Sequence, residues 1–181
     1  MSALENPIEK IMISEEEIRN KVQEIAKEID SDYKDREPML LAILNGSFVF
    51  AADLVRAVSI PVGISFIFAS SYGASTVSSG KVDIHSVKGF DPAGKDIIIV
   101  EDIIDSGRTL SKIKEYLYEN GANSVELCTF LNKPSRRVVE LDVKYIGFEV
   151  PDEFVVGYGL DFDSKYRQYP FVGVLKQEYY E

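Results

Sequence analysis

The chain has 181 residues, of which 45% are hydrophobic and 28% are charged, and its formal net charge is −10 at pH 7. A chain of this length buries about 70% of its unfolded surface in one core, so we expect one domain spanning residues 1–181. No apolar run approaches the roughly 20 residues of a membrane span, and we expect no membrane partner. The acidic balance argues against a nucleic-acid partner, because affinity for a phosphate backbone comes largely from Lys and Arg.

The first residues and the single cysteine indicate the compartment. The segment MSALENPIEK lacks the basic stretch and apolar core of a secretory signal, so a cytoplasmic location is the default expectation. Cys128 is the only cysteine, which excludes an internal disulfide and a multi-cysteine zinc site. It lies in the apolar run SVELCTF, where a small core residue is the favoured interpretation over a nucleophile.

Hydrophobic patterns predict strands and helices in alternation. Ser14 and Glu17 form a capping-box pattern with apolar residues behind it at helical spacing, which predicts a helix from about 14 to 31. The later elements, in chain order, are a strand at 39–44, a helix at 48–58, strands at 62–70, 81–87 and 97–100, a helix at 110–121, and strands at 124–131 and 171–175. Such alternation predicts an α/β fold with an open, mainly parallel twisted sheet flanked by helices. In such sheets ligands bind beyond the carboxyl ends of the strands.

The stretch IIIVEDIIDSGRTL, at residues 97–110, joins a strand to a helix through a short loop. The loop from Asp105 to Thr109 can present backbone N–H groups and the positive end of the helix dipole to an anion. Ser106 and Thr109 add hydroxyl donors, and Gly107 lets the backbone come close, which favours a phosphate monoester as ligand. The spacing of the other glycines excludes a Walker loop and a dinucleotide fingerprint.

Glu101 and Asp102 lie directly before this phosphate loop, although carboxylates repel phosphate. They therefore indicate a ligand that also carries hydroxyls or positive charge, and a ribose with a hydrated Mg²⁺ nearby provides both. The alternative interpretation is a solvated strand end whose acidic residues favour the N-terminus of the following helix.

Two blocks of the sequence carry a resemblance to a known family. The segment VEDIIDSGRTL resembles the phosphoribosyl pyrophosphate (PRPP) signature of the type I phosphoribosyltransferases. Residues 147–167, GFEVPDEFVVGYGLDFDSKYR, are similar to the hypoxanthine-guanine branch of that family. The resemblance runs from about Leu41 to about Gly173. It implies the fold of this family, with a small hood formed by the N-terminus and residues from about 145 to 181.

The resemblance also implies a reaction. The enzyme would transfer the 5-phosphoribosyl group from PRPP to N9 of a 6-oxopurine, hypoxanthine or guanine, with Mg²⁺ as cofactor. The products would be IMP or GMP and pyrophosphate, as in purine salvage. Relatives are commonly dimers or tetramers, so a homodimer or homotetramer is implied as well.

On the PRPP side, the resemblance assigns three groups of residues. These are Leu44, Asn45 and Gly46 for the pyrophosphate, Glu101 and Asp102 for the ribose hydroxyls directly or through metal, and Asp105, Ser106, Gly107, Arg108 and Thr109 for the 5-phosphate. In relatives the first group often contains a non-proline cis peptide, and many relatives carry Lys at the position of Asn45. Ser71 and Tyr72 begin the Ser/Gly-rich segment 71–80, which matches a flexible lid.

On the purine side, the resemblance assigns single residues. Asp105 would be the general base that faces N7, and Lys133 would read the 6-oxo group. Phe154 would stack on the base, and Val155 would contact the base edge through its backbone. Asp161 would make a second magnesium contact, and Arg167 would contact pyrophosphate. The resemblance thus predicts that residues distant in the sequence meet around one ligand.

Two other functions share some of these features. A phospho-acceptor receiver domain also has an acidic pair after an apolar strand and a later Lys-Pro, here Lys133-Pro134. Its acidic pair follows the first strand, however, whereas about a hundred residues precede the pair in this chain. A regulatory relative that keeps the PRPP loop but binds RNA is the second alternative, and the acidic composition argues against it.

Overall fold

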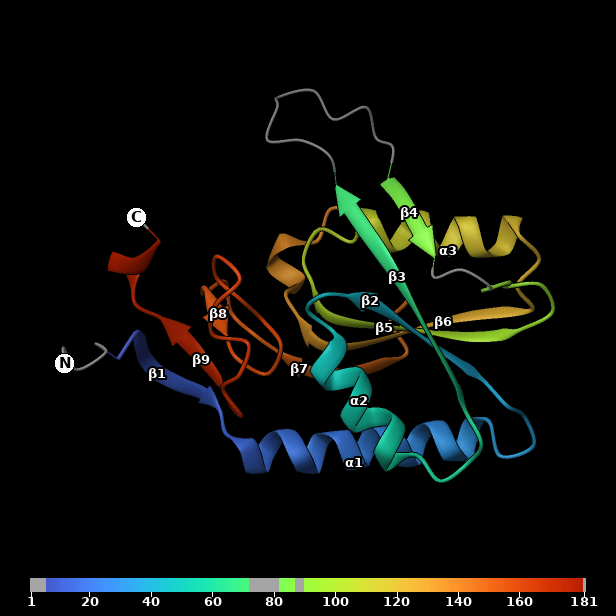
Figure 1. Cartoon of the computed structure of the whole chain (residues 1–181), viewed down its shortest axis with the longest axis horizontal. Coiled ribbons are helices and arrows are strands. Elements are labelled where there is room, and N and C mark those ends of the chain that lie inside the picture. The colour runs from blue at the N-terminus through green and yellow to red at the C-terminus, as the bar shows by residue number, and fades with distance from the viewer. Residues whose placement is uncertain (1–5, 72–81, 87–89, 181) are drawn as a thin grey trace.

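The computed structural model describes residues 6–71, 82–86 and 90–180 of the chain (Figure 1). Tyr72 and the rest of the predicted lid up to residue 80 lie outside these residues. The lid therefore stays a prediction. Ser71, where the predicted lid begins, is the last residue of a strand.

Six strands form a large sheet in the order β4-β3-β2-β5-β6-β7 (Figure 1). Their bounds are β2 Met39–Leu44, β3 Gly63–Ser71, β4 Val82–Ser86, β5 Asp96–Ile104, β6 Ser124–Asn132 and β7 Tyr145–Glu149. All neighbouring strands are parallel except β3 and β4, which are antiparallel. The predicted open, mainly parallel sheet is therefore confirmed.

Three α-helices flank this sheet. They are α1 Glu15–Asp32, α2 Phe48–Ala57 and α3 Arg108–Glu119. The Ser14 hydroxyl accepts a hydrogen bond from the Glu17 N–H at 3.3 Å, and the Glu17 carboxylate accepts one from the Ser14 N–H at 2.8 Å, so the predicted capping box is confirmed. No helix in the described ranges 6–71, 82–86 and 90–180 is long and apolar enough to cross a membrane.

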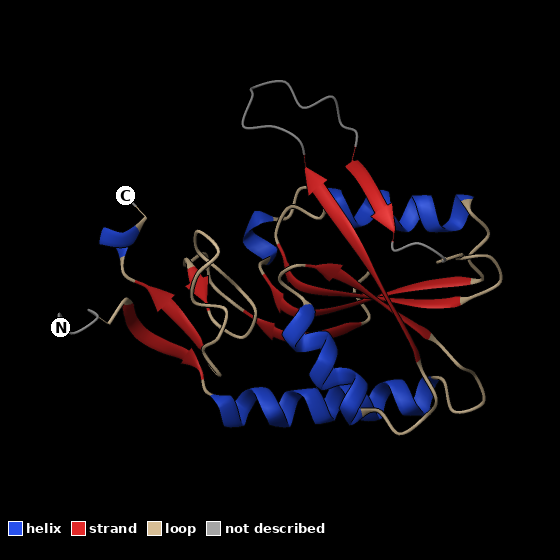
Figure 2. Ribbon diagram, viewed as in Figure 1, coloured by secondary structure: helices blue, strands red, loops and turns tan. Residues whose placement is uncertain are grey.

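The sheet has a hydrophobic core on each face, with α1 and α2 on one face and α3 on the other (Figure 2). Successive residues of a strand point to opposite faces, and in β2 Leu40 joins the core under α1 and α2 while Leu41 joins the core under α3. This double coverage explains why β2 and β5 read as continuous apolar runs. Cys128 of β6 is 1% exposed within the first core, which confirms its prediction as a core residue.

A second, smaller sheet joins segments from far apart in the sequence. Its strands are β1 Ile8–Ile13, β9 Val172–Leu175 and β8 Val155–Val156, antiparallel and in that order. The sequence predicted β9 but neither β1 nor β8. The predicted hood also began at about 145, whereas β7 is an edge strand of the large sheet, so the later part of the small sheet begins only after β7.

Phe130 of β6 is the centre of the aromatic packing between the sheet and the helices, and we expect it to contribute strongly to stability. Its ring is 1% exposed and lies 4.6 Å from the Tyr158 ring and 5.4 Å from the Phe50 ring, measured between centroids. We expect Phe130→Ala to lower the free energy of unfolding by about 3–5 kcal/mol, because the cavity remains partly empty. Urea unfolding at fixed protein concentration measures the free energy of unfolding of wild type and variant. Val138→Ala, at a side chain that is 62% exposed, is the control and should change it by at most about 0.5 kcal/mol.

Candidate active site

A cavity of about 370 Å³ lies at the carboxyl ends of β2, β3 and β5. Its lining residues are Ile43, Leu44, Gly46, Ala69, Glu101, Asp102, Ile103, Ile104, Asp105, Ser106, Gly107, Thr109 and Leu110. The fold thus brings the predicted pyrophosphate loop, the acidic pair and the phosphate loop to one place. This is the end of a parallel sheet where ligands of α/β proteins bind.

The phosphate loop turns the chain from β5 into α3. Gly107 has a φ of 80°, in the left-handed region that glycine adopts without steric cost, and it precedes the first residue of the helix. A side chain at position 107 would also meet the Val139 carbonyl oxygen at 3.0 Å. The first N–H groups of α3 have no partner within the helix, and Gly107, Thr109 and Leu110 line the cavity, so this helix start can offer donors to an anion bound there.

The acidic pair ends the regular part of β5 and is partly buried. The Asp102 N–H donates to the Glu101 carboxylate at 3.0 Å, and the Ile103 N–H donates to the Asp102 carboxylate at 2.7 Å. Burial raises the pKa of Glu101 well above its ordinary range, and the charge of Asp102 raises it further. Burial also raises the pKa of Asp102, against the hydrogen bonds and the nearby Arg167 charge that lower it.

This electrostatic arrangement fits a hydrated divalent cation. Both side chains offer carboxylate oxygens, which are the ligands that Mg²⁺ prefers, and a bound cation would favour their ionised forms. Asp161 was the third predicted metal contact. In the described part of the chain no three His, Cys, Asp or Glu residues are grouped closely enough to hold a metal, so Asp161 does not join the pair in one cluster.

The predicted pyrophosphate loop follows β2. The peptide bond between Leu44 and Asn45 is cis, which confirms the cis peptide that the resemblance implied. Gly46 packs so closely that a Cβ atom there would lie 1.6 Å from the Asp102 Oδ2 atom. Gly159 approaches from the other side, since a Cβ atom on it would lie 2.3 Å from the Gly46 carbonyl oxygen. Position 159 requires glycine, because the clash there is with a backbone atom and φ is 97°, whereas a side chain at position 46 would force the Asp102 carboxylate to move.

Lys133 lies next to the cavity, at the end of β6. Its N–H donates to the Ile104 carbonyl at 3.0 Å, which ties it to the end of β5. Its side chain is buried, and Nζ donates to the Glu153 carbonyl at 2.8 Å and lies 3.7 Å from an Asp152 carboxylate oxygen. A buried ammonium with a fixed direction is suited to reading an acceptor oxygen on a ligand.

Phe154 and Val155 follow the residues that Lys133 contacts. The Phe154 ring is 39% exposed, stacks on Tyr180 with a centroid distance of 4.9 Å, and meets Phe162 edge to face at 5.6 Å. Val155 is buried in β8. An exposed aromatic ring beside a buried ammonium is an arrangement that a planar base can use.

Asp161 and Arg167 form an ion pair at 2.8 Å in the long segment between β8 and β9. The other Asp161 oxygen accepts the Ser164 N–H at 2.8 Å, and Arg167 donates to the Gly159 carbonyl at 2.6 Å. Arg167 is therefore held against the same glycine that packs on Gly46. The charge of Arg167 lowers the pKa of Asp102, which links this segment to the acidic pair.

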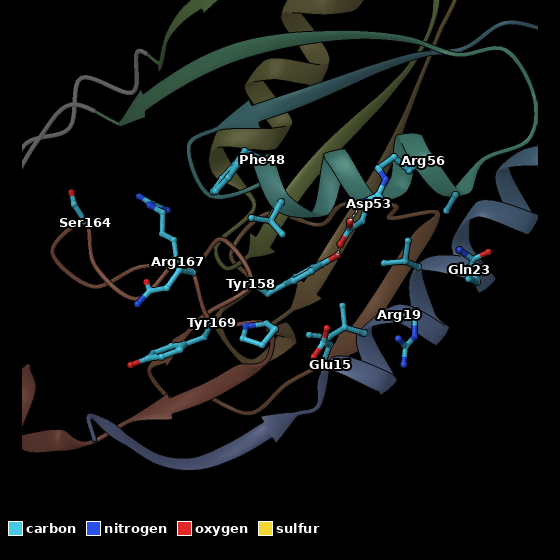
Figure 3. A pocket seen from close by; sticks show the side chains of 16 residues that line it. Glu15, Arg19, Gln23, Phe48, Asp53, Arg56, Tyr158, Ser164, Arg167 and Tyr169 are labelled. Atoms are coloured by element: carbon cyan, nitrogen blue, oxygen red, sulfur yellow. Dashed lines mark hydrogen bonds and ion pairs between the residues drawn. The ribbon is translucent and has the colours of Figure 1, made fainter. Parts of the chain in front are cut away.

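A larger cavity, of about 890 Å³, lies between α1, α2 and the segment from Tyr158 to Pro170 (Figure 3). Asp53 of α2 points toward Tyr158 and accepts a hydrogen bond from the Tyr158 hydroxyl at 2.8 Å, and it pairs with Arg56 at 3.5 Å. Arg167 is the only predicted site residue in its lining. Since it contains neither the phosphate loop nor the acidic pair, the smaller cavity is the candidate active site.

Sequence reasoning missed Arg137. Its Nε atom donates to the Asp105 carbonyl at 3.1 Å, and its Nη2 atom donates to the Asn132 side-chain oxygen. The only signal in the sequence is a pair of basic residues shortly after Lys133-Pro134, and such a pair is usually solvent-exposed. The contact depends on the pairing of β5 with β6, which the sequence does not show.

Comparison with known proteins adds independent information. A model of the phosphoribosyl transferase domain matches residues 13–163. The chain is 47% identical over 180 residues to the hypoxanthine-guanine phosphoribosyltransferase of Bacillus subtilis, covering 98% of this chain and 99% of the relative. It is 47% identical over 165 residues to the hypoxanthine phosphoribosyltransferase of Salmonella typhimurium, covering 90% and 93%.

Solved structures of similar proteins share the fold. A hypoxanthine phosphoribosyltransferase of Staphylococcus aureus superposes with a TM-score of 0.93 at 38% identity, covering 100% of this chain and 99% of the other. A hypoxanthine-guanine phosphoribosyltransferase of Bacillus anthracis gives 0.88 at 46% identity, covering 93% and 99%. The family model that matches residues 13–163 and the relatives at 47% identity show that the chain belongs to the phosphoribosyltransferase family.

Proposed function

We propose that this protein is a purine-salvage enzyme that transfers the 5-phosphoribosyl group of PRPP to N9 of hypoxanthine or guanine. The products are IMP or GMP and pyrophosphate. The observation that carries the proposal is the cavity at the ends of β2 and β5, where an anion-binding loop and an acidic pair lie side by side. The full-length relatives named as hypoxanthine-guanine phosphoribosyltransferases support the choice of purine.

PRPP has three parts, and the cavity offers one group of residues for each. The loop from Ser106 to Thr109 holds the 5-phosphate through backbone N–H groups and hydroxyls, with Arg108 at the first helical position. Glu101 and Asp102 accept the ribose hydroxyls and hold Mg²⁺. Mg²⁺ bound there would neutralise charge on the pyrophosphate of PRPP. The cis-containing loop at 44–46 holds the pyrophosphate end.

The purine approaches the ribosyl carbon from the side of Lys133 and Phe154. Phe154 stacks on the base, Val155 contacts its edge, and Lys133 donates to the 6-oxo oxygen. Asp105 accepts the proton from N7, which makes the base a better nucleophile. Arg167 stabilises the negative charge that develops on the departing pyrophosphate. Asp161 orients Arg167 through their ion pair.

We also propose the oligomeric state, the location and the partners that the resemblance implies. The protein is expected to form a homodimer or homotetramer and to act in the cytoplasm. Its substrates and products are small molecules. We propose no role for nucleic acid or membrane, in agreement with the net charge of −10.

A substrate panel tests the reaction class. The protein is incubated with PRPP, Mg²⁺ and each of hypoxanthine, guanine, xanthine, adenine, uracil and orotate, and nucleotide formation is measured. We expect IMP and GMP but no AMP, UMP or OMP. Nucleotide from a pyrimidine alone, or labelling by acetyl phosphate without any transfer to a base, would overturn the proposal.

Asp105→Asn tests the general base. We expect kcat to fall by about 10²–10⁴, the usual contribution of general acid–base catalysis, while PRPP binds with little change. The reason is that the amide cannot accept the N7 proton, although the backbone of the phosphate loop is intact. Steady-state kinetics give kcat, and isothermal titration gives PRPP affinity. Unchanged turnover would remove Asp105 from the mechanism.

Lys133→Ala tests how the base is read. An ammonium donates hydrogen bonds but accepts none, so it suits the 6-oxo oxygen of hypoxanthine and opposes the amino group of adenine. Unpaired polar groups cost about 1–3 kcal/mol each, and an unpaired charge costs more, so we expect wild type to disfavour adenine by at least about tenfold at this contact. The variant should lose kcat/KM for hypoxanthine and narrow the gap to adenine. An unchanged ratio of the two kcat/KM values would mean that another group, such as the backbone of Val155, reads the base.

A further inference from the structure

The segment that follows β6 holds the loop that follows β5. Three consecutive carbonyl groups, from the last residue of β5 to the second residue of that loop, accept hydrogen bonds from the segment after β6. The pairs are Ile104 with the Lys133 N–H, Asp105 with Arg137 Nε, and Ser106 with the N–H groups of Val138 and Val139, at 3.0 to 3.1 Å. Backbone groups hold the first and third carbonyls, and only the middle one depends on a side chain.

Arg137 also forms a hydrogen bond with the end of β6. Its Nη2 atom donates to the side-chain oxygen of Asn132, which is 6% exposed and is the last residue of β6. Asn132 is paired in register with Ile104, the last residue of β5. The guanidinium therefore spans the ends of two neighbouring strands, and its planar fork of donors suits two fixed acceptors. The Arg137 Cδ atom also lies 3.2 Å from where a Cβ atom of Gly107 would stand.

The Asp105 carboxylate has no comparable support of its own. The residue is exposed, and within residues 6–71, 82–86 and 90–180 its side chain forms no hydrogen bond or ion pair. Its direction is therefore set by the backbone of residue 105. Among the residues that the structure describes, only Arg137 donates a hydrogen bond to the carbonyl of that residue.

We propose that Arg137 is a positioning residue that orients Asp105 through its backbone carbonyl. The inference rests on the proposed function, in which Asp105 accepts the N7 proton. Because the carbonyls of residues 104 and 106 are held by backbone N–H groups, we expect the phosphate loop to stay folded without the Arg137 side chain, while the Asp105 carbonyl and the Asn132 side-chain oxygen lose their donor. A misplacement of about 1 Å at a reacting group costs about 10²-fold in rate.

A double-mutant cycle tests the proposal. Arg137→Met removes both donors and keeps a long arm, and it is made in wild type and in Asp105→Asn. We expect Arg137→Met to lower kcat at least about tenfold with the KM for PRPP within about threefold. In the Asp105→Asn background we expect a further loss of at most about twofold, because the group that Arg137 positions has already been removed. Losses that multiply in the double variant would overturn the proposal.

Arg137→Lys separates position from charge. Lysine keeps the positive charge but cannot bond both acceptors through a planar fork. We expect kcat to stay at least about threefold below wild type. If Arg137 instead acted by charge on the 5-phosphate, Arg137→Met would raise the KM for PRPP, Arg137→Lys would restore it, and the proposal would be wrong. Lysine also serves as the second variant should the methionine variant not fold.

Arg136→Met is the matched control. Arg136 is the neighbouring residue, and its positive charge also acts on Asp105, but its Nε atom pairs with the exposed carboxylate of Asp152 at 2.6 Å, so the control tests charge near Asp105 without the Arg137 hydrogen bond. Exposed ion pairs contribute little, so kcat should remain within about twofold of wild type. A drop equal to that of Arg137→Met would assign the effect to the whole segment and overturn the proposal. A wild type that forms no nucleotide from PRPP and hypoxanthine would contradict the proposed function itself, whereas an active wild type with multiplying losses contradicts only the role of Arg137.

Discussion

The close packing around Gly46 is the constraint on which the site depends. A Cβ atom there would overlap Asp102 at 1.6 Å, and the Gly159 position leaves only 2.3 Å to the Gly46 carbonyl oxygen. Three segments therefore meet at one backbone position, namely the turn after β2, the end of β5 and the segment between β8 and β9. Each segment carries a different part of the proposed chemistry. Because Gly46 and Gly159 have no side chains, the three segments lie close enough to contact one ligand.

The same contact connects the large sheet to the small one. Gly159 exchanges hydrogen bonds with Arg167, since its N–H donates to the Arg167 carbonyl at 3.1 Å and its carbonyl accepts the guanidinium at 2.6 Å. Arg167 is thereby held where its charge opposes the effect of burial on the pKa of Asp102. A loop outside the large sheet thus contributes both to the shape of the cavity and to its electrostatics.

The sequence predicted most of the large sheet because its signals are local. The run at residues 97–100 is buried on both faces, and Gly107 and the capping box at Ser14 mark the starts of helices by their own chemistry. The strands β1 and β8 were missed for a physical reason. Strand β8 has only two residues, and β1 pairs with β9 through two register irregularities, so neither shows a regular period.

For the site, the limit of prediction lies in which segments meet. Residues that follow one strand, such as Glu101 and Ser106, could be grouped from sequence alone, whereas the grouping of Lys133 with Ile104 needed the resemblance or the strand order. Neither the resemblance nor the strand order predicted the role of Arg137, because its partners are a backbone carbonyl and a buried side-chain amide at the ends of neighbouring strands. Hydrogen bonds to backbone groups leave little mark on residue type, because any carbonyl can accept them.

Placing the carboxylates and the phosphate loop on the same strand–loop–helix unit resolves their apparent conflict. Asp102 and Ser106 are four residues apart, a length of chain that spans at most about 14 Å even when extended. This limit keeps the negative charge and the N–H groups at the start of α3 close enough for one sugar phosphate to contact both. In the proposed function the hydroxyls of a ribose would face the carboxylates while its phosphate would face the helix N-terminus, so each end of the unit would bind the part of the ligand that it attracts. A ligand of phosphate alone would meet the repulsion without the compensating hydroxyls, and the order of residues along one segment would thus favour a phosphorylated sugar.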